Sequence, residues 1–253
     1  MKVTFLGTGT SQGVPIIGCQ CEVCKSSDLK DKRLRSSVMI EDKGQTFVID
    51  TGPDFREQML REDVRRLDAV IYTHEHRDHV GGLDDIRGFN FVMGTAIDVY
   101  ADSNVEKAMH QMYPYIFSEK KYPGIPEITL HHIDGSPFSI GETKFIPIRV
   151  MHYKLPIYGY RIGNFTYITD AKSIPQEEKE KIKGSEVMVL NALRREEHIS
   201  HLTLDEAINL VKELGVKKVF FTHISHQLGK HAVVEKELPP GMHLAHDGLV
   251  IEV

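Results

Sequence analysis

The chain has 253 residues, of which 41% are hydrophobic and 26% are charged, a balance typical of folded globular proteins that excludes a disordered chain. The formal net charge of −5 argues against broad nucleic-acid binding, because proteins that neutralise many phosphates usually carry an excess of Lys and Arg. No internal repeat, low-complexity tract or linker interrupts the sequence. We therefore expect one domain over residues 1–253.

Short runs of β-branched and apolar residues predict strands along the whole chain. In chain order they cover residues 3–6, 37–40, 46–49, 69–72, 143–150, 158–162, 165–169, 187–190, 218–221 and 249–253. The pair Gly163-Asn164 separates two of these runs, which predicts a tight hairpin.

Helical periodicity is found between these runs, at residues 53–61, 103–112, 176–183 and 203–214. It is clearest in the last segment, where Thr203 and Glu206 form a predicted capping box and Gly215 ends the helix. The alternation of strands and helices predicts an α/β layered fold. Residues 113–127 contain three prolines and four aromatic residues, which predicts a loop or lid without regular structure.

The strongest chemical signal is the segment 74–79, which follows the predicted strand 69–72. It holds three of the chain's 14 histidines together with an aspartate: His74, His76, Asp78 and His79. Burial of such groups without partners would be costly, and neutral imidazole is a common metal ligand. We therefore expect two adjacent metal ions here, each bound by part of the cluster.

Further ligands must come from other strand ends. His152, Asp170 and His223 each follow a predicted strand. Each of them alone is a weak signal, because a polar residue after a strand is usually an ordinary loop residue. Together with the segment 74–79 they form a coherent candidate ligand set.

Three cysteines lie within six residues, as Cys19, Cys21 and Cys24. Three thiols cannot all pair with one another, so the cluster indicates metal binding in a reducing compartment. A closed structural zinc site needs four ligands, and His226 is the candidate for the fourth. The alternative is that the three thiols simply pack in the core.

The pattern His74-x-His76-x-Asp78-His79, followed by His152, Asp170 and His223, resembles the metallo-β-lactamase fold hydrolases. This resemblance implies a four-layer αβ/βα sandwich with a dinuclear site at one edge. It further implies two ligand groups bridged by Asp170, the first formed by His74, His76 and His152 and the second by Asp78, His79 and His223.

The segment Gly7–Pro15 and the cysteines after it resemble the PhnP-type phosphodiesterases of bacterial phosphonate breakdown, which are similar to tRNA 3′-processing endonucleases. The resemblance implies hydrolysis of small phosphodiesters, with cyclic ribose phosphates as candidates, by a hydroxide bound to two metals. It implies zinc or manganese at the catalytic centre, with iron left open, and one structural zinc. Asp78 would orient the hydroxide, and His201 would donate a proton to the leaving group.

Two alternatives stay open at this stage. One is a tRNA 3′-processing endoribonuclease, for which the segment 113–127 offers only the two lysines Lys120 and Lys121 as a basic arm. The other is a non-hydrolytic protein similar to the B protein of pyrroloquinoline quinone biosynthesis.

The apolar run at the N-terminus is too short for a signal peptide, and no stretch approaches the length of a membrane span. We expect a cytoplasmic protein with a small-molecule partner and no membrane or nucleic-acid partner. Association with a second copy of the chain is left open.

Overall fold

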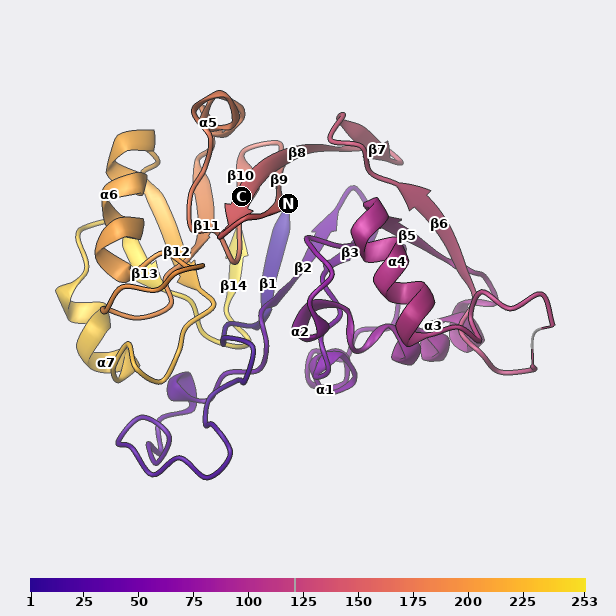
Figure 1. Cartoon of the computed structure of the whole chain (residues 1–253), viewed down its shortest axis with the longest axis horizontal. Helices are drawn as coiled ribbons and strands as arrows, with labels where there is room; N and C mark the ends of the chain where they lie inside the picture. The colour runs from indigo at the N-terminus through magenta and orange to yellow at the C-terminus, as the bar shows by residue number, and fades with distance from the viewer. Residues whose placement is uncertain (121) are drawn as a thin grey trace.

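The computed structural model describes residues 1–120 and 122–253, and it consists of two β-sheets packed face to face between two layers of helices (Figure 1). The first sheet has the strand order β14-β1-β2-β3-β4-β5-β6. Its strands are β1 (Lys2–Gly7), β2 (Ser37–Asp42), β3 (Gln45–Ile49), β4 (Ala69–Ile71), β5 (Ile97–Ala101), β6 (Ile128–His132) and β14 (Val250–Glu252).

The second sheet has the order β13-β12-β11-β10-β9-β8-β7. Its strands are β7 (Phe138–Ile140), β8 (Thr143–His152), β9 (Leu155–Ile162), β10 (Phe165–Tyr167), β11 (Val187–Asn191), β12 (Lys218–Thr222) and β13 (Met242–Leu244). Strands β10 to β13 are parallel to one another, whereas β8 and β9 form an antiparallel hairpin.

The helices form the two outer layers. Against the first sheet lie α1 (Phe55–Arg61), α2 (Arg77–Val80), α3 (Arg87–Met93) and α4 (Ser103–Met112). Against the second lie α5 (Gln176–Ile182), α6 (Leu204–Leu214) and α7 (His231–Val234). Short 3-10 turns occupy Leu29–Asp31, Leu83–Ile86 and Glu235–Glu237. The predicted four-layer sandwich is confirmed.

Three apolar clusters hold the four layers together. The central one joins the inner faces of the two sheets and includes Phe5, Phe145 and Phe220. Each of the other two lies between a sheet and its helices, as Val211 of α6 and Val105 of α4 illustrate. Because each sheet is covered on both faces, its inner strands are apolar on both sides, which explains why their sequences read as nearly continuous apolar runs.

All ten predicted strands and all four predicted helices are present, and the hairpin at Gly163-Asn164 joins β9 to β10. The patterns did not predict β5, β6, β7, β13, α2, α3 and α7. Strands β6, β7 and β13 lie at sheet edges, where one side is less covered and the apolar signal is weak. The unpredicted helices have four to seven residues, which is too short for a clear helical period.

Residues 113–127 lack helix and strand wherever the structure describes them, as expected, and lie beyond the end of α4 (Figure 1). Lys121, one of the two lysines considered for a basic arm, lies outside the described residues. Within the described residues, no helix is both long enough and apolar enough to cross a membrane.

The predicted capping box of α6 is formed. The Thr203 hydroxyl accepts a hydrogen bond from the Glu206 amide at 3.2 Å, and the Glu206 carboxylate accepts one from the Thr203 amide at 2.8 Å. Gly215 ends the helix with a left-handed backbone, at a φ of 70°. Both termini of α6 are therefore satisfied by the groups that the sequence predicted.

We expect Thr203→Ala to lower the free energy of unfolding by about 1 kcal/mol, because the N-cap hydrogen bond is lost. Denaturant unfolding followed by circular dichroism measures the change. Thr203→Ser is the control, since its hydroxyl retains the cap and should retain most of the stability. Equal losses in both variants would contradict the capping argument.

Candidate metal centre

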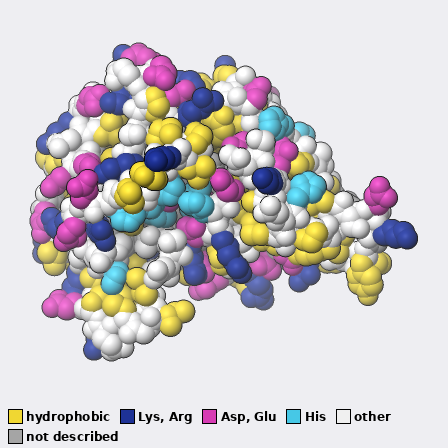
Figure 2. Space-filling view, viewed as in Figure 1, with side chains coloured by type: hydrophobic (Ala, Val, Ile, Leu, Met, Phe, Trp, Pro, Cys, Tyr) yellow, Lys and Arg dark blue, Asp and Glu magenta, His cyan; other side chains and the backbone are white. Residues whose placement is uncertain are grey.

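The candidate residues meet at one edge of the sandwich because their strands end there. His74 follows β4 in the first sheet, whereas His152 ends β8, Asp170 follows β10 and His223 follows β12 in the second sheet. Strands β8, β10 and β12 run in the same direction, so their carboxyl ends lie at one edge. Figure 2 shows histidine side chains gathered in the middle of one face, in a hollow between its two halves.

The first group of predicted ligands lies together. The Nε2 atom of His74 lies 3.1 Å from Nδ1 of His76. The His152 ring centroid lies 5.1 Å from that of His76 and 5.8 Å from that of His74. These three imidazoles come from both sheets, so only the folded chain brings them together.

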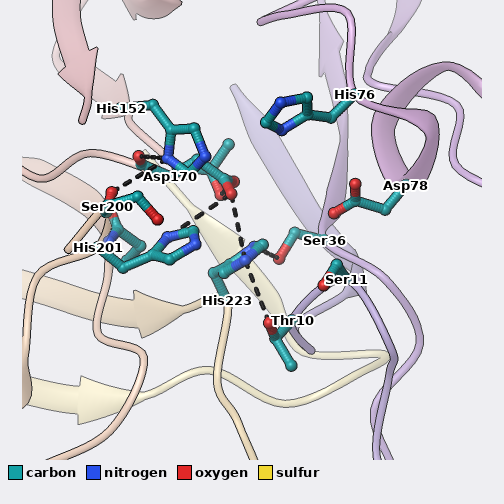
Figure 3. A network of polar contacts seen from close by, with 12 residues as sticks. Thr10, Ser11, Ser36, His76, Asp78, His152, Asp170, Ser200, His201 and His223 are labelled. Atoms are coloured by element: carbon teal, nitrogen blue, oxygen red, sulfur yellow. Dashed lines mark hydrogen bonds and ion pairs between the residues drawn. The ribbon is translucent and has the colours of Figure 1, made fainter. Parts of the chain in front are cut away.

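The second group lies around Asp170. The Nε2 atom of His79 lies 3.2 Å from an oxygen of Asp78 and 3.3 Å from an oxygen of Asp170. The Nε2 atom of His223 lies 3.2 Å from the other oxygen of Asp170. Figure 3 shows Asp170 between His152 and His223, with His76 and Asp78 on the opposite side. The structure thus brings all seven predicted residues into one centre.

Hydrogen bonds fix the orientation of two of the imidazoles through their Nδ1 atoms. His79 Nδ1 donates to the Asp50 carboxylate at 2.7 Å. His152 Nδ1 donates to the backbone carbonyl oxygens of Asp170 at 2.7 Å and Ser200 at 3.0 Å. With the proton on Nδ1, Nε2 keeps its lone pair and is a ligand atom.

Hydroxyl groups fix the orientation of the His74 and His223 imidazoles, again through Nδ1. The Thr73 hydroxyl donates to Asp50 at 2.8 Å, so its oxygen accepts from His74 Nδ1 at 2.9 Å. The Ser36 hydroxyl donates to the Gly9 carbonyl at 2.9 Å, so its oxygen accepts from His223 Nδ1 at 3.3 Å. Four imidazoles are therefore held in the tautomer that leaves Nε2 free for a ligand bond.

Carboxylates dominate the electrostatics of the centre. Burial favours the neutral acid, but His223 and His79 hold the pKa of Asp170 well below its usual range, and His79 does so for Asp78. Burial lowers the pKa of His74 and of His223, so both favour the neutral form. The ion pairs that the structure describes for Asp50, Asp78 and Asp170 are all with histidines.

These residues fit divalent metal ions. His79 Nε2 is buried and has no hydrogen-bond partner among the described residues, although it faces two carboxylates. One atom each of His74, His79 and Asp170 lie within 4.8 Å of one another, which is compatible with a shared ion. A set of imidazoles and ionised carboxylates suits Zn²⁺, Mn²⁺ or Fe²⁺. Burial lowers the pKa of His79, but Asp78, Asp170 and Asp50 outweigh it and raise the pKa well above the usual value, so a metal bound to Nε2 would displace a proton.

His201 lies on the border of the centre. Its Nδ1 atom is 3.7 Å from an oxygen of Asp170, and its ring is stacked with that of His223 at a centroid distance of 4.8 Å. Burial and the neighbouring His223 lower the pKa of His201 to about 3. One atom each of His152, Asp170 and His201 also lie within 4.8 Å of one another, so the position alone permits a ligand role as well as an acid role.

The cysteine cluster forms a second, separate site. One ligand atom each from Cys19, Cys21, Cys24 and His226 lie within 4.8 Å of one another. His226 Nδ1 lies 3.2 Å from the Cys21 sulfur and 3.5 Å from the Cys19 sulfur. The backbone amide of Cys24 and the His226 ring lower the pKa of the Cys21 thiol to about 6, which favours the thiolate that a metal binds.

Sequence reasoning missed Asp50. It follows β3, is fully buried, and accepts hydrogen bonds from His79, from the Thr73 amide and from the Thr73 hydroxyl. Its φ is 66°, a left-handed conformation that non-glycine residues adopt at a cost. A signal was available, because Asp50 is a polar residue directly after an apolar strand, as are the predicted ligands Asp170 and His223.

Comparisons with known proteins agree with this geometry. A profile of the beta-lactamase superfamily domain matches residues 45–224. The solved structure of a new diphosphatase from the PhnP family is 43% identical, with a TM-score of 0.93, and the match covers 100% of this chain and 97% of that one.

Two curated relatives are longer than this chain. An octanoyltransferase of Porphyromonas gingivalis is 42% identical over 252 residues, which cover 98% of this chain and 51% of that protein. A ribonuclease Z of Bacillus cereus is 28% identical over 167 residues, which cover 64% of this chain and 49% of that protein. The chain thus spans about half the length of these relatives. From the profile match and the similarity over the full length of a solved relative, the chain belongs to the beta-lactamase superfamily and, within it, to the PhnP family.

Proposed function

We propose that the chain is a metal-dependent phosphodiesterase that hydrolyses small phosphodiesters, with cyclic ribose phosphates as candidate substrates. The observation that carries the proposal is the convergence of six histidine and aspartate side chains around the carboxylate of Asp170. The metallo-β-lactamase fold and the similarity to a PhnP-family diphosphatase support hydrolysis as the reaction class.

The resemblance assigns His74, His76 and His152 to one ion and Asp78, His79 and His223 to the other, and Asp170 would contact both. Two bound divalent ions supply Lewis acidity toward phosphate oxygens and an activated water. Asp78 would orient that water, because its carboxylate lies 3.2 Å from Nε2 of His79 and its side chain is 15% exposed.

His201 would donate the proton to the leaving oxygen. Its pKa of about 3 makes the imidazole neutral at neutral pH when no substrate is bound. A phosphodiester carries a negative charge, and a negative charge nearby favours the imidazolium. Proton donation by His201 therefore requires that the bound phosphodiester raise the pKa of His201 toward the range in which a proton can be transferred.

The cysteine site would hold a structural zinc. Three cysteines and one histidine are a closed ligand set, without a position for substrate. His226 lies three residues after His223, so this site also anchors the loop that carries a ligand of the catalytic centre.

A ribonuclease acting on precursor tRNA is the second candidate, because the chain is 28% identical to a ribonuclease Z. One assay panel separates the possibilities. It contains bis-p-nitrophenyl phosphate, a cyclic ribose phosphate, an organic diphosphate and a precursor tRNA. The proposal predicts metal-dependent turnover of the small esters and little cleavage of tRNA. Efficient tRNA cleavage without turnover of the small esters would contradict it.

We expect Asp50→Asn to weaken the binding of divalent metal by about 10- to 100-fold, because the amide holds the His79 ring less firmly than a carboxylate does. Titration of metal-free protein against a chromophoric chelator measures the affinity. Asp98→Asn is the matched control, since Asp98 contacts His131 at 3.0 Å outside the centre. Unchanged affinity in Asp50→Asn would show that Asp50 has no role in holding the ligand.

Cys21→Ser should lose the structural zinc and lower the melting temperature, because zinc binding at such sites contributes directly to folding. Elemental analysis should find three metal ions per chain in the unaltered protein and two in this variant. Lys25→Ser, an exposed change in the same loop, should keep both the zinc and the melting temperature. A variant that kept its melting temperature but lost turnover would mean that the cluster is not structural.

His201→Ala should slow an alkyl phosphodiester by about 10²- to 10⁴-fold, because an alkoxide needs a proton in order to leave. A nitrophenyl ester should be slowed much less, since nitrophenolate leaves without one. His198→Ala is the control, because His198 lies beside His201 at a centroid distance of 5.0 Å. An equal loss with both esters, or a loss of bound metal, would instead assign His201 a positioning or ligand role.

A further inference from the structure

The turn between β8 and β9 places Tyr153 in a left-handed backbone conformation, which is unfavourable for a bulky residue. His152 pairs with Leu155, so Tyr153 and Lys154 alone form the turn. Two-residue hairpin turns require left-handed backbone, and Gly, Asn or Asp usually occupies those positions. Tyr153 has a φ of 55°, which costs energy for a bulky side chain.

Packing within the fold does not explain this choice of residue. The Tyr153 side chain is 50% exposed, and the amino group of Lys154 lies 5.3 Å from its ring centroid. A glycine or asparagine would fit the same turn without strain. Strained residues that contribute little to packing are typical of functional positions.

Tyr153 lies directly beside the metal centre. It lines an open groove of about 520 Å³ whose other walls include His76, His152 and Ile199. Ile199 is 64% exposed although it is apolar. Two candidate metal ligands therefore line the same groove as an exposed aromatic ring and an exposed aliphatic side chain.

The geometry points to Tyr153 as a specificity residue that stacks on a flat, unsaturated ring, such as a nucleobase, carried by one arm of the phosphodiester substrate. Ile199 supplies a second apolar contact, and Lys154 places a positive charge at the groove where further phosphate or polar groups of the substrate would lie. This inference rests on the proposed phosphodiesterase function and narrows its substrates to esters that bear such a ring.

A substrate that carries a flat ring accounts for both the exposed Tyr153 side chain and the apolar lining of the groove. Base stacking on aromatic side chains tolerates different ring types and requires an exposed aromatic face, which Tyr153 offers. A saturated sugar phosphate alone would need hydrogen-bonding groups, whereas Tyr153, Leu155 and Ile199 give this groove a largely apolar lining.

The test compares two esters with the same reacting atoms, uridine 2′,3′-cyclic phosphate and 1-O-methylribose 2,3-cyclic phosphate. The metal-loaded protein should have a kcat/KM about 5- to 50-fold higher for the uridine ester, as expected for one stacked base at an open site. Tyr153→Phe should keep this preference. Tyr153→Asn should abolish it while its melting temperature stays equal or rises, because the turn is no longer strained.

Lys43→Asn is the matched control, because Lys43 also has a left-handed backbone, with a φ of 49°, in the hairpin turn between β2 and β3. This variant should relieve strain without changing the preference. Equal kcat/KM for the two esters in the unaltered protein, or a preference that survives Tyr153→Asn, would overturn the inference.

Binding measurements separate this inference from the proposed function. Calorimetry with uridine 3′-monophosphate and ribose 3-phosphate reports the contribution of the base without turnover. If neither ester is hydrolysed but uridine monophosphate binds more tightly through Tyr153, the phosphodiesterase proposal fails and the ring-binding role stands. If both esters are hydrolysed and the base adds nothing to binding, the ring-binding role fails and the phosphodiesterase proposal stands.

Discussion

Asp170 carries a buried carboxylate that needs positive charge nearby. The other residues of the candidate metal centre are arranged around it. The carboxylate is buried, and its described ion-pair partners are imidazoles from helix α2, from the loop before α6 and from the loop after β12. Burying a carboxylate costs several kcal/mol unless charge and hydrogen bonds compensate it. The imidazoles compensate this cost only in part. Burial lowers the pKa of His201 and of His223, whereas the carboxylates of Asp78, Asp170 and Asp50 outweigh burial at His79 and raise its pKa well above the usual value. Divalent cations satisfy the carboxylate and the imidazole lone pairs together, so the arrangement is that of a metal centre.

Rigid supports hold this arrangement in place. The left-handed backbones of Asp50, Asp170 and His223 occur just after three different strands, where the chain turns sharply to present a side chain. The sheets and their covered cores determine where these turns lie. On one side, hydrogen bonds of Ile224 with Thr8 and Thr10 tie the loop of His223 to the N-terminal segment that precedes the cysteines. The candidate structural zinc site and the candidate catalytic centre thus share one loop.

Local sequence patterns predicted the inner strands except β5, the longer helices and the ligand candidates of the segment 74–79, because burial on both faces and clustered histidines are local signals. His152, Asp170 and His223 were weak signals singly and became candidates through their common position after predicted strands. Edge strands such as β6 and β7 were missed because their apolar pattern is weak. Asp50 and the hydrogen bonds that set the histidine tautomers were missed because they depend on contacts between distant segments, such as Ser36 with His223. The strain at Tyr153 could not be predicted either, since the register of β8 and β9 defines the turn.

Anomalous X-ray diffraction from crystals of the metal-loaded protein tests the central claim most directly. The account predicts two neighbouring peaks in the His and Asp cluster, one on each side of the Asp170 carboxylate, and a third peak among Cys19, Cys21, Cys24 and His226. The absence of a peak at Asp170, or a single ion bound there with His201 as a ligand, would contradict the assignment of a dinuclear hydrolytic centre.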